Sequence, residues 1–395
     1  MDIYTVCASF DCERAVVADD MILTLSAPTT AGSAMLDGYT SLIESEALVR
    51  LTSAGYKLCG KTHVGELAID LVGETCYSGP LYKDGKAVNA AAESVLCGDA
   101  VLALCLDANG SVRRAAAQSG LCGIKPTYGT VSRFGVIPVA CSGDTVSLMA
   151  KTAAECAQAL EAISAYDAKD GTCLPDSMRE VKDAPVKRVA LLTSMLKGAD
   201  ADVTAAIEAA VAALEEKGIT VERVEDSVIC LARAAWNILR CAELCNNVSR
   251  YDGVKYGHRA ESFNGIDELY TNSRTEGFGD LLKTAIIYGS ETLSTENYMP
   301  VYDKALRVRR VIVEAFASLF ERFDAVLMPA CSTMGYTKET IEAAPRLVFE
   351  ENYYTAPASI SGLPVAVACG VQLVGPAFSD KALLDAAAIL AKEDR

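Results

Sequence analysis

The fold of this chain is most narrowly restricted by a strand–helix–strand pattern between residues 187 and 224. Residues 189–192 (VALL) form a short apolar run that is typical of a buried strand, and residues 219–224 predict a second strand. Gly218 supplies a helix stop before the second strand. The intervening segment carries one apolar stripe at helical spacing, made of Val203, Ile207, Val211 and Leu214. Such units build α/β proteins, so we expect an α/β fold.

The rest of the pattern predicts a single domain. We expect helices at 44–54, 153–163, 300–322 and 380–392, strands at 56–59, 136–139 and 325–328, and a buried helix running into a strand at 90–106. Pro138 weakens the strand at 136–139. The chain shows no internal repeat and only a weak seam at 164–185. We therefore expect one domain over residues 1–395, with a core of about 25–163 and 300–395 and a subsidiary lobe of about 185–299.

Composition excludes several classes of function. A net charge of −16 argues against an extended phosphate-binding surface, so we expect no direct binding of nucleic acid. No apolar run reaches membrane-spanning length and the start lacks a signal-peptide pattern, which favours a cytoplasmic protein. The 15 cysteines include no C-x-x-C pair, and the two histidines, His63 and His258, have no partner at ligand spacing. We expect reduced thiols, no metal and no cofactor.

One segment matches a nucleotide-binding motif in its residue types. Residues 55–62 (GYKLCGKT) satisfy the phosphate-loop pattern G-x-x-x-x-G-K-[ST]. A phosphate loop needs a strand, a flexible loop and then the start of a helix. Here an expected helix precedes Gly55, and the four middle residues contain no glycine and favour a strand. The match is therefore interpreted as accidental.

Two motifs near the middle of the chain are far more specific. Residues 107–113 (DANGSVR) are followed by residues 120–129 (GLCGIKPTYG). Together they resemble the core of the amidase-signature family, with the pattern D-x-G-G-S-I-R, a small-residue helix and G-x-x-G-x-K-P-T-x-G. Residues 60–62 (GKT) stand where that family has its lysine motif, and Glu66 continues it. The resemblance implies an α/β amidase-signature fold, in which helices cover both faces of a mixed central sheet.

Three later segments are similar to the A subunits of glutamyl-tRNA(Gln)/aspartyl-tRNA(Asn) amidotransferases. These are residues 250–257 (RYDGVKYG), 274–279 (RTEGFG) and 361–364 (SGLP). The resemblance runs from about residue 25 onward, and the helical lead-in usual in that family is expected to be missing. It implies a possible amidotransferase-like partner subunit, which would hold any tRNA, and a small amide as substrate if the chain is active.

The resemblance also assigns catalytic roles. The family hydrolyses amides with a lysine, a bridging serine and a nucleophilic serine, without histidine. On this basis Lys61 is the base, which must be desolvated and neutral to act, and Ser111 is the nucleophile. The backbone N–H groups of Ala108, Asn109, Gly110 and Ser111 are the expected oxyanion hole. Ser111 also suits the start of a helix, which does not exclude catalysis.

Several departures from the family pattern weaken the catalytic relay and the glutamine pocket. Counting back from Ser111 places Ala87 at the bridging-serine position, outside any glycine-rich loop, and alanine has no hydroxyl to relay a proton. Ser78 and Ser94 remain open as replacements. The arginine that binds the substrate carboxylate is replaced within residues 283–286, at Thr284 or Ala285. The acidic partner of that arginine is replaced by Asn352.

Two functions remain open. The first is impaired amide hydrolysis by Ser111 with Lys61 as base, with standard glutaminase activity absent or weak. The second is a non-catalytic pseudo-amidase that acts as a binding or scaffold subunit. The sequence leaves the substrate-binding residues unknown.

Overall fold

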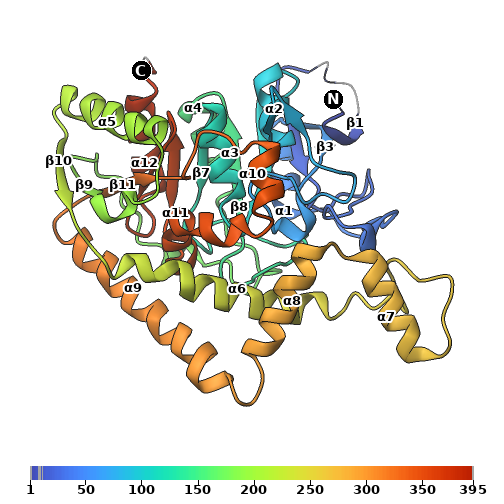
Figure 1. The fold of residues 1–395 in the computed structure, drawn as a ribbon. Coiled ribbons are helices and arrows are strands. Elements are labelled where there is room, and N and C mark those ends of the chain that lie inside the picture. Colours follow the sequence, from blue (N-terminus) through green and yellow to red (C-terminus); the bar gives the residue numbers. More distant parts are fainter. Residues whose placement is uncertain (1, 8–9, 11, 394–395) are drawn as a thin grey trace.

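The computed structural model describes residues 2–7, 10 and 12–393. Within this part of the chain an 11-stranded mixed sheet has the order β1-β3-β2-β6-β8-β7-β12-β13-β11-β9-β10 (Figure 1). Its strands are β1 (Tyr4–Cys7), β2 (Ala15–Asp19), β3 (Lys57–Thr62), β6 (Leu102–Asp107), β7 (Cys122–Lys125), β8 (Thr145–Ala150), β9 (Arg188–Leu192), β10 (Thr220–Val224), β11 (Ala325–Pro329), β12 (Val365–Ala368) and β13 (Val371–Val374). A small antiparallel ribbon pairs β4 (Tyr82–Lys83) with β5 (Lys86–Ala87).

Strand direction brings the candidate site residues to one edge of the sheet. β2 pairs in parallel with β3 on one side and with β6 on the other. The carboxyl ends of these three strands therefore share an edge. Lys61 is near the end of β3, Asp19 ends β2 and Asp107 ends β6.

Helices cover both faces of this sheet, and alternating strand residues feed two apolar cores. Val16 and Ala18 face one core, whereas Ala15 and Val17 face the other. The first core is closed by α1 (Glu46–Ser53), α4 (Ala153–Ile163), α5 (Ala201–Glu216) and α12 (Asp380–Leu390). The second core is closed by α2 (Ala90–Cys97), α3 (Ser111–Ser119), α6 (Ala232–Val248), α9 (Lys304–Phe320) and α11 (Leu347–Ser361).

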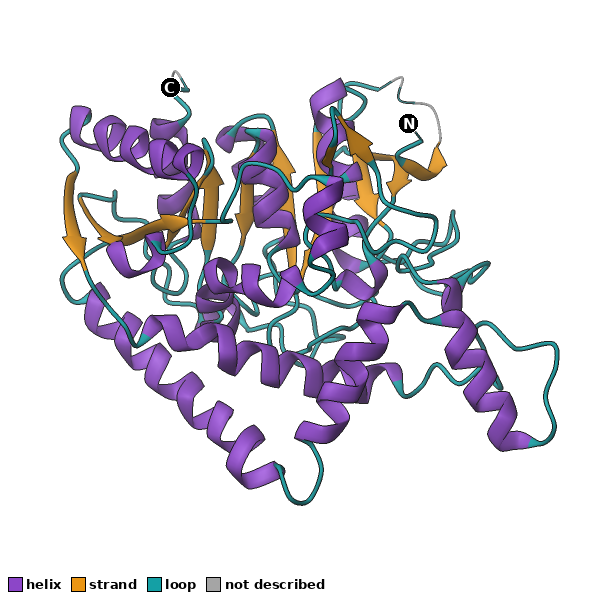
Figure 2. Cartoon of the chain, in the orientation of Figure 1, coloured by secondary structure: helices purple, strands orange, loops and turns teal. Residues whose placement is uncertain are grey.

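The remaining helices lie mostly outside these two layers. They are α7 (Ile266–Gly277), α8 (Asp280–Thr292) and α10 (Lys338–Ala343), with the short turns η1 (Ala34–Leu36), η2 (Glu66–Ala68), η3 (Asp176–Met178), η4 (Thr193–Leu196), η5 (Ile229–Leu231) and η6 (Tyr298–Asp303). Figure 2 shows the long helices gathered below the strands, where Figure 1 labels α6, α8 and α9, with α7 projecting to one side. The segment 185–299 thus supplies α6, α7 and α8 of these lower helices, whereas α9 follows it, and the segment also supplies β9 and β10, which extend the central sheet.

The expected α/β fold with a mixed, doubly covered sheet is confirmed. The helix expected at 153–163 is α4. The strand expected at 136–139 is wrong, because Val136 makes only an isolated bridge to Ile22 and Pro138 has no N–H to continue a ladder. The helix expected from residue 300 is also corrected: a π-helical turn, η6, precedes α9, which begins at Lys304.

Candidate active site

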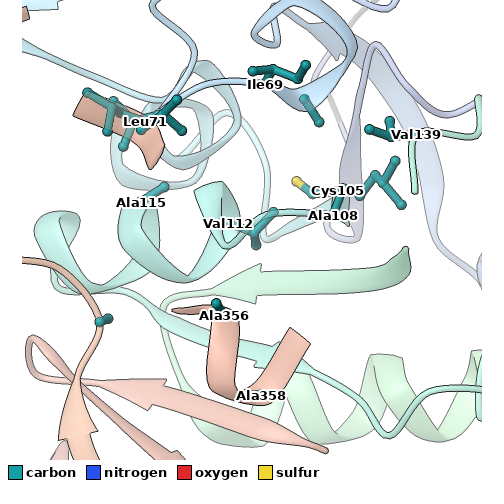
Figure 3. Packing of buried hydrophobic residues seen from close by; sticks show 14 of the residues in the cluster. Ile69, Leu71, Cys105, Ala108, Val112, Ala115, Val139, Ala356 and Ala358 are labelled. Atoms are coloured by element: carbon teal, nitrogen blue, oxygen red, sulfur yellow. The ribbon is translucent and has the colours of Figure 1, made fainter. Parts of the chain in front are cut away.

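The loop between β6 and α3 places Ser111 at the start of a helix. Gly110 has a φ of +91° and caps α3. A Cβ at Gly110 would lie 2.3 Å from Cβ of Thr355 in α11, so only glycine fits there. Figure 3 shows Ala108 of this loop and Val112 of α3 within the apolar packing that includes Ala356 of α11.

A buried ion pair fixes the shape of this loop. Arg113 Nε donates to Asp107 Oδ2 at 2.9 Å, and the N–H of Gly110 donates to Asp107 Oδ1 at 2.8 Å. Arg113 also donates to the carbonyl of Thr355 at 2.8 Å and to the hydroxyl of Ser359 at 2.7 Å. Burial acts to raise the pKa of Asp107, but Arg113 outweighs it and holds that pKa below its usual value. The loop of residues 107–111 is therefore held against α11.

Ser111 itself is nearly buried, with 3% of its surface exposed. Within the described residues, no hydrogen bond to its hydroxyl is present. The N-terminus of α3 carries the positive end of the helix dipole, which favours a negative charge next to this serine. Because Asp107 already accepts from Gly110 N–H, the N–H groups of Ala108, Asn109 and Ser111 are the better candidates for an oxyanion.

Lys61 is buried at the end of β3, with 1% of its surface exposed. Its Nζ lies 2.6 Å from Asp20 Oδ1 and donates to Thr29 Oγ1 at 2.5 Å and to the carbonyl of Pro28 at 2.9 Å. Burial lowers the pKa of Lys61, while the carboxylate of Asp20 opposes that shift. The lysine is thus desolvated, as expected of a base, but it is also ion-paired.

The Asp19–Asp20 turn stands between Lys61 and the Ser111 loop. Since β2 separates β3 from β6, those two strands are about 10 Å apart. Asp19 Oδ2 accepts from the N–H of Leu106 at 2.7 Å, and burial raises the pKa of Asp19 to about 7. The two expected catalytic residues therefore lie at the same edge of the sheet without a hydrogen bond between them.

Ala87 lies in β5 and is nearly buried. Its N–H donates to the carbonyl of Tyr336 at 2.8 Å. Ala87 lines a shallow pocket together with Ala115 and Ser119 of α3, one and two turns beyond Ser111. Its assignment to the bridging position stays a prediction.

The two serines left open as replacements are engaged elsewhere. Ser78 Oγ lies 3.2 Å from His63 Nδ1. Ser94 Oγ accepts from the hydroxyl of Tyr4 at 2.9 Å. Neither serine is hydrogen-bonded to Lys61, which donates instead to the hydroxyl of Thr29.

The positions expected for the substrate clamp carry no charge. The hydroxyl of Thr284 donates back to the carbonyl of Asp280 at 2.9 Å, and Ala285 is fully buried. Asn352 is fully buried, and its Nδ2 donates to Asn237 Oδ1 at 2.6 Å. A charged side chain that replaces the clamp has to come from another element.

Sequence reasoning missed Asp20 and Thr29. Both precede the lysine motif by more than 30 residues and carry no motif of their own. The signal that could have found them is the pair Asp19-Asp20 directly after the apolar run 15–18, since polar residues at the end of a buried strand often reach a site.

Three other observations concern the phosphate-loop pattern, metal ligands and membrane-spanning helices. Gly55–Thr62 forms a turn and the strand β3, and Lys61 points to Asp20, so this segment lacks the loop-to-helix geometry that holds phosphates. In the described residues, no cluster of three or more His, Cys, Asp or Glu side chains could hold a metal ion. The same part of the chain contains no helix with the length and apolar character needed to cross a membrane.

The fold is that of an α/β protein in which Lys61 and the Ser111 loop lie at the carboxyl edge of a mixed sheet. The family model for Amidase matches residues 18–384. The A subunit of glutamyl-tRNA(Gln) amidotransferase from Lachnoclostridium phytofermentans is 33% identical over 94% of this chain and 81% of its own length. The corresponding protein of Maridesulfovibrio salexigens is 34% identical over 95% of this chain and 83% of its own length.

The solved structures agree with these sequence matches. The crystal structure of the A subunit of glutamyl-tRNA(Gln) amidotransferase from Thermotoga maritima has a TM-score of 0.79 and 26% identity, covering 99% of this chain and 87% of that chain. The chain therefore belongs to the amidase family, and the resemblance inferred from residues 107–129 is confirmed.

Proposed function

We propose that this protein binds a small amide at the Ser111 loop and hydrolyses it slowly, with Ser111 as nucleophile and Lys61 as base. The observation that carries this proposal is the set of contacts of Lys61 Nζ. Its partners are Asp20, Thr29 and Pro28, and no hydrogen bond joins it to Ser111. An ion-paired lysine is less available as a base than a free neutral one, because the carboxylate stabilises the protonated form, which cannot accept a proton.

The loop geometry supports binding of an amide carbonyl. The helix start at Ser111 and the N–H groups of Ala108 and Asn109 provide donors for a developing oxyanion. The buried Asp107–Arg113 pair holds these groups in place. The alanine at position 87 and the uncharged positions 284, 285 and 352 support weak or absent glutaminase activity. The proposal includes a cytoplasmic location.

A fluorophosphonate probe tests this function, since it labels a serine that a base can activate. We expect slow labelling of the wild-type chain and none of Ser111→Ala. Ser119→Ala is a matched control, because Ser119 is at the other end of α3 and its hydroxyl donates to the carbonyl of Ala115. Labelling that survives in Ser111→Ala, or wild-type glutamine turnover at the rate of an efficient enzyme, contradicts the proposal.

A second candidate is a non-catalytic subunit that keeps the fold to bind a partner. Two observations favour it: Lys61 is neutralised by Asp20, and the relatives are themselves subunits. The partner would then resemble the other subunits of an amidotransferase. Co-purification of a defined partner subunit that Ser111→Ala leaves unchanged supports this candidate, whereas a strictly monomeric protein with Ser111-dependent turnover contradicts it.

A further inference from the structure

Unpaired polar atoms are concentrated behind the Ser111 loop. Among the described residues, 15 buried side-chain nitrogen and oxygen atoms have no hydrogen-bond partner. The largest group comes from five side chains: Arg240 contributes three atoms, Asp70 two, Asn109 two, and Trp236 and Asn352 one each. Buried polar groups are almost always paired, so such a group of atoms requires an explanation.

A chain of contacts connects these side chains to the Ser111 loop. On α6 and α11, the guanidinium of Arg240 lies 5.5 Å from the ring centre of Phe349, and Asn352 is three residues further along α11. One turn beyond Asn352, the hydroxyl of Thr355 donates to the carbonyl of Asn109 at 3.0 Å. Asn109 directly precedes Gly110 and Ser111. Arg240 is thus connected to the loop through residues on successive turns of α11.

Arg240 is the charged member of this group and is fully buried. Its Nε, Nη1 and Nη2 atoms all lack a partner. Burial lowers the pKa of Arg240, but a guanidinium keeps its proton at physiological pH. The thiol of Cys241 lies beside it, and burial raises the pKa of that thiol, so the thiol is no counter-anion. A buried charge without a partner is strongly destabilising, which is why such charges are paired in proteins.

In the described part of the chain, no carboxylate forms an ion pair with Arg240. Asp70 influences its titration but forms no ion pair with it, and burial and Glu74 raise the pKa of Asp70 to about 8. Glu351 of α11 accepts from the hydroxyl of Tyr336 and from a backbone N–H.

A second guanidinium in the same region adds positive charge. Arg114 donates only to three carbonyls and to the hydroxyl of Thr355. Arg240 and Arg114 thus bring two guanidinium groups to this interior, and neither forms an ion pair within the described residues.

We propose that Arg240 binds a carboxylate group of the small amide that the Ser111 loop addresses, and that the free Oδ1 of Asn352 accepts a hydrogen bond from the same ligand. A carboxylate matches the planar fork of a guanidinium and pairs with it through two parallel hydrogen bonds. This inference rests on the proposed function for the identity of the ligand as an amide. The clamp lost at positions 284, 285 and 352 is then replaced by a cation on α6.

Two probes of similar size test the charge requirement: succinamate, which carries one carboxylate and one amide, and the neutral diamide succinamide. Binding is measured by calorimetry on the full-length chain. We expect succinamate to bind wild type at least about tenfold more tightly than succinamide, as a charge-assisted pair requires. Equal affinity for both, or no binding of succinamate at millimolar concentration, overturns the proposal.

Variants then test the residue. Arg240→Met should lose at least about tenfold in succinamate affinity, with Arg240→Lys intermediate. Arg233→Met is the matched control on the same helix, because Arg233 is 42% exposed and pairs with Glu350. An unchanged affinity in Arg240→Met, or an equal loss in Arg233→Met, overturns the proposal.

Two further measurements test whether Arg240 is unpaired in the folded chain and separate ligand binding from hydrolysis. Without ligand, Arg240→Met should melt at or above the wild-type temperature, because it removes an unpaired buried charge. A clear loss of stability shows that Arg240 is paired within the chain and contradicts the proposal. Ser111→Ala separates the carboxylate site from the proposed hydrolysis. If this variant binds succinamate selectively while the wild-type chain shows no serine labelling, the carboxylate site is supported and only slow hydrolysis is contradicted.

Discussion

At the scale of single residues, the pair formed by Lys61 and Asp20 controls both stability and basicity. The two side chains are 1% and 0% exposed, and the atoms that pair are 2.6 Å apart. Each charge therefore depends on the other for compensation, since water reaches neither. Forming the neutral amine of Lys61 requires weakening this pair, because Asp20 stabilises the ammonium form, and this couples catalytic chemistry to folding.

This coupling predicts a non-additive result. Asp20→Asn should lower the free energy of unfolding by about 3 kcal/mol or more, because it leaves a buried ammonium without a counter-charge. Lys61→Met should cost a similar amount, whereas the double variant should recover much of the loss. Urea unfolding measures all three. The exposed pair Arg223–Glu208 is the control, and Glu208→Gln should change stability by less than about 1 kcal/mol. Strictly additive losses at Lys61 and Asp20 contradict this account.

At the scale of elements, helix α3 begins and ends on glycines with very different surroundings. Gly110 has a φ of +91° and is in close contact with Thr355, while Gly120 has a φ of +70° and open space around its Cα. The first glycine is thus required by both backbone conformation and packing, and the second by conformation alone. This asymmetry places the rigid end of α3 at Ser111.

Alanine substitutions at the two ends separate these effects. Gly120→Ala should cost only about 1 kcal/mol, the cost of a left-handed backbone for a residue with a side chain. Gly110→Ala should cost several times as much and displace the Ser111 loop, because the new Cβ would lie 2.3 Å from Thr355. Urea unfolding of both variants gives the comparison. Equal costs would show that contact with α11 does not fix this loop.

The elements also show which parts of the fold the sequence encodes locally. Helix α4 and strand β9 follow directly from apolar patterns in the sequence. The loop before Ser111 is recognisable because its motif needs an aspartate, a glycine and an arginine at fixed spacing. Residues 136–139 have strand-like composition but have no neighbour with which to form a ladder, and composition alone does not reveal that.

The site depends more on contacts that are distant in sequence. The motif predicts Lys61, but the ion pair of this lysine depends on β2 lying beside β3, a pairing that apolar periodicity does not encode. Arg240 lies in a helix where an arginine is expected to face solvent, and its burial follows only from the packing of α6 against α11. Both features are therefore beyond local sequence reasoning.

At the scale of the whole molecule, the segment 185–299 contacts the rest of the chain in two places. The segment 185–299 contributes β9 and β10 to the central sheet, where β9 pairs with β11. It also contributes Trp236 of α6, which is fully buried. The ring of Trp236 packs directly on Gly143, just before β8, because a Cβ on that glycine would lie 2.1 Å from the ring. Loss of either contact would expose apolar surface on both the segment 185–299 and the rest of the chain.

We therefore predict that both parts unfold together. Trp236 is the single tryptophan of the chain and is located where α6 packs on the core, so its fluorescence reports separation of the two parts. Far-ultraviolet circular dichroism reports all helices at once. Under equilibrium urea unfolding the two signals should give one coincident transition, as a single cooperative unit requires. A fluorescence change that precedes the loss of helix would mean that the lower helices detach first. The shared sheet edge at β9 and β11 would then contribute too little to couple the two parts.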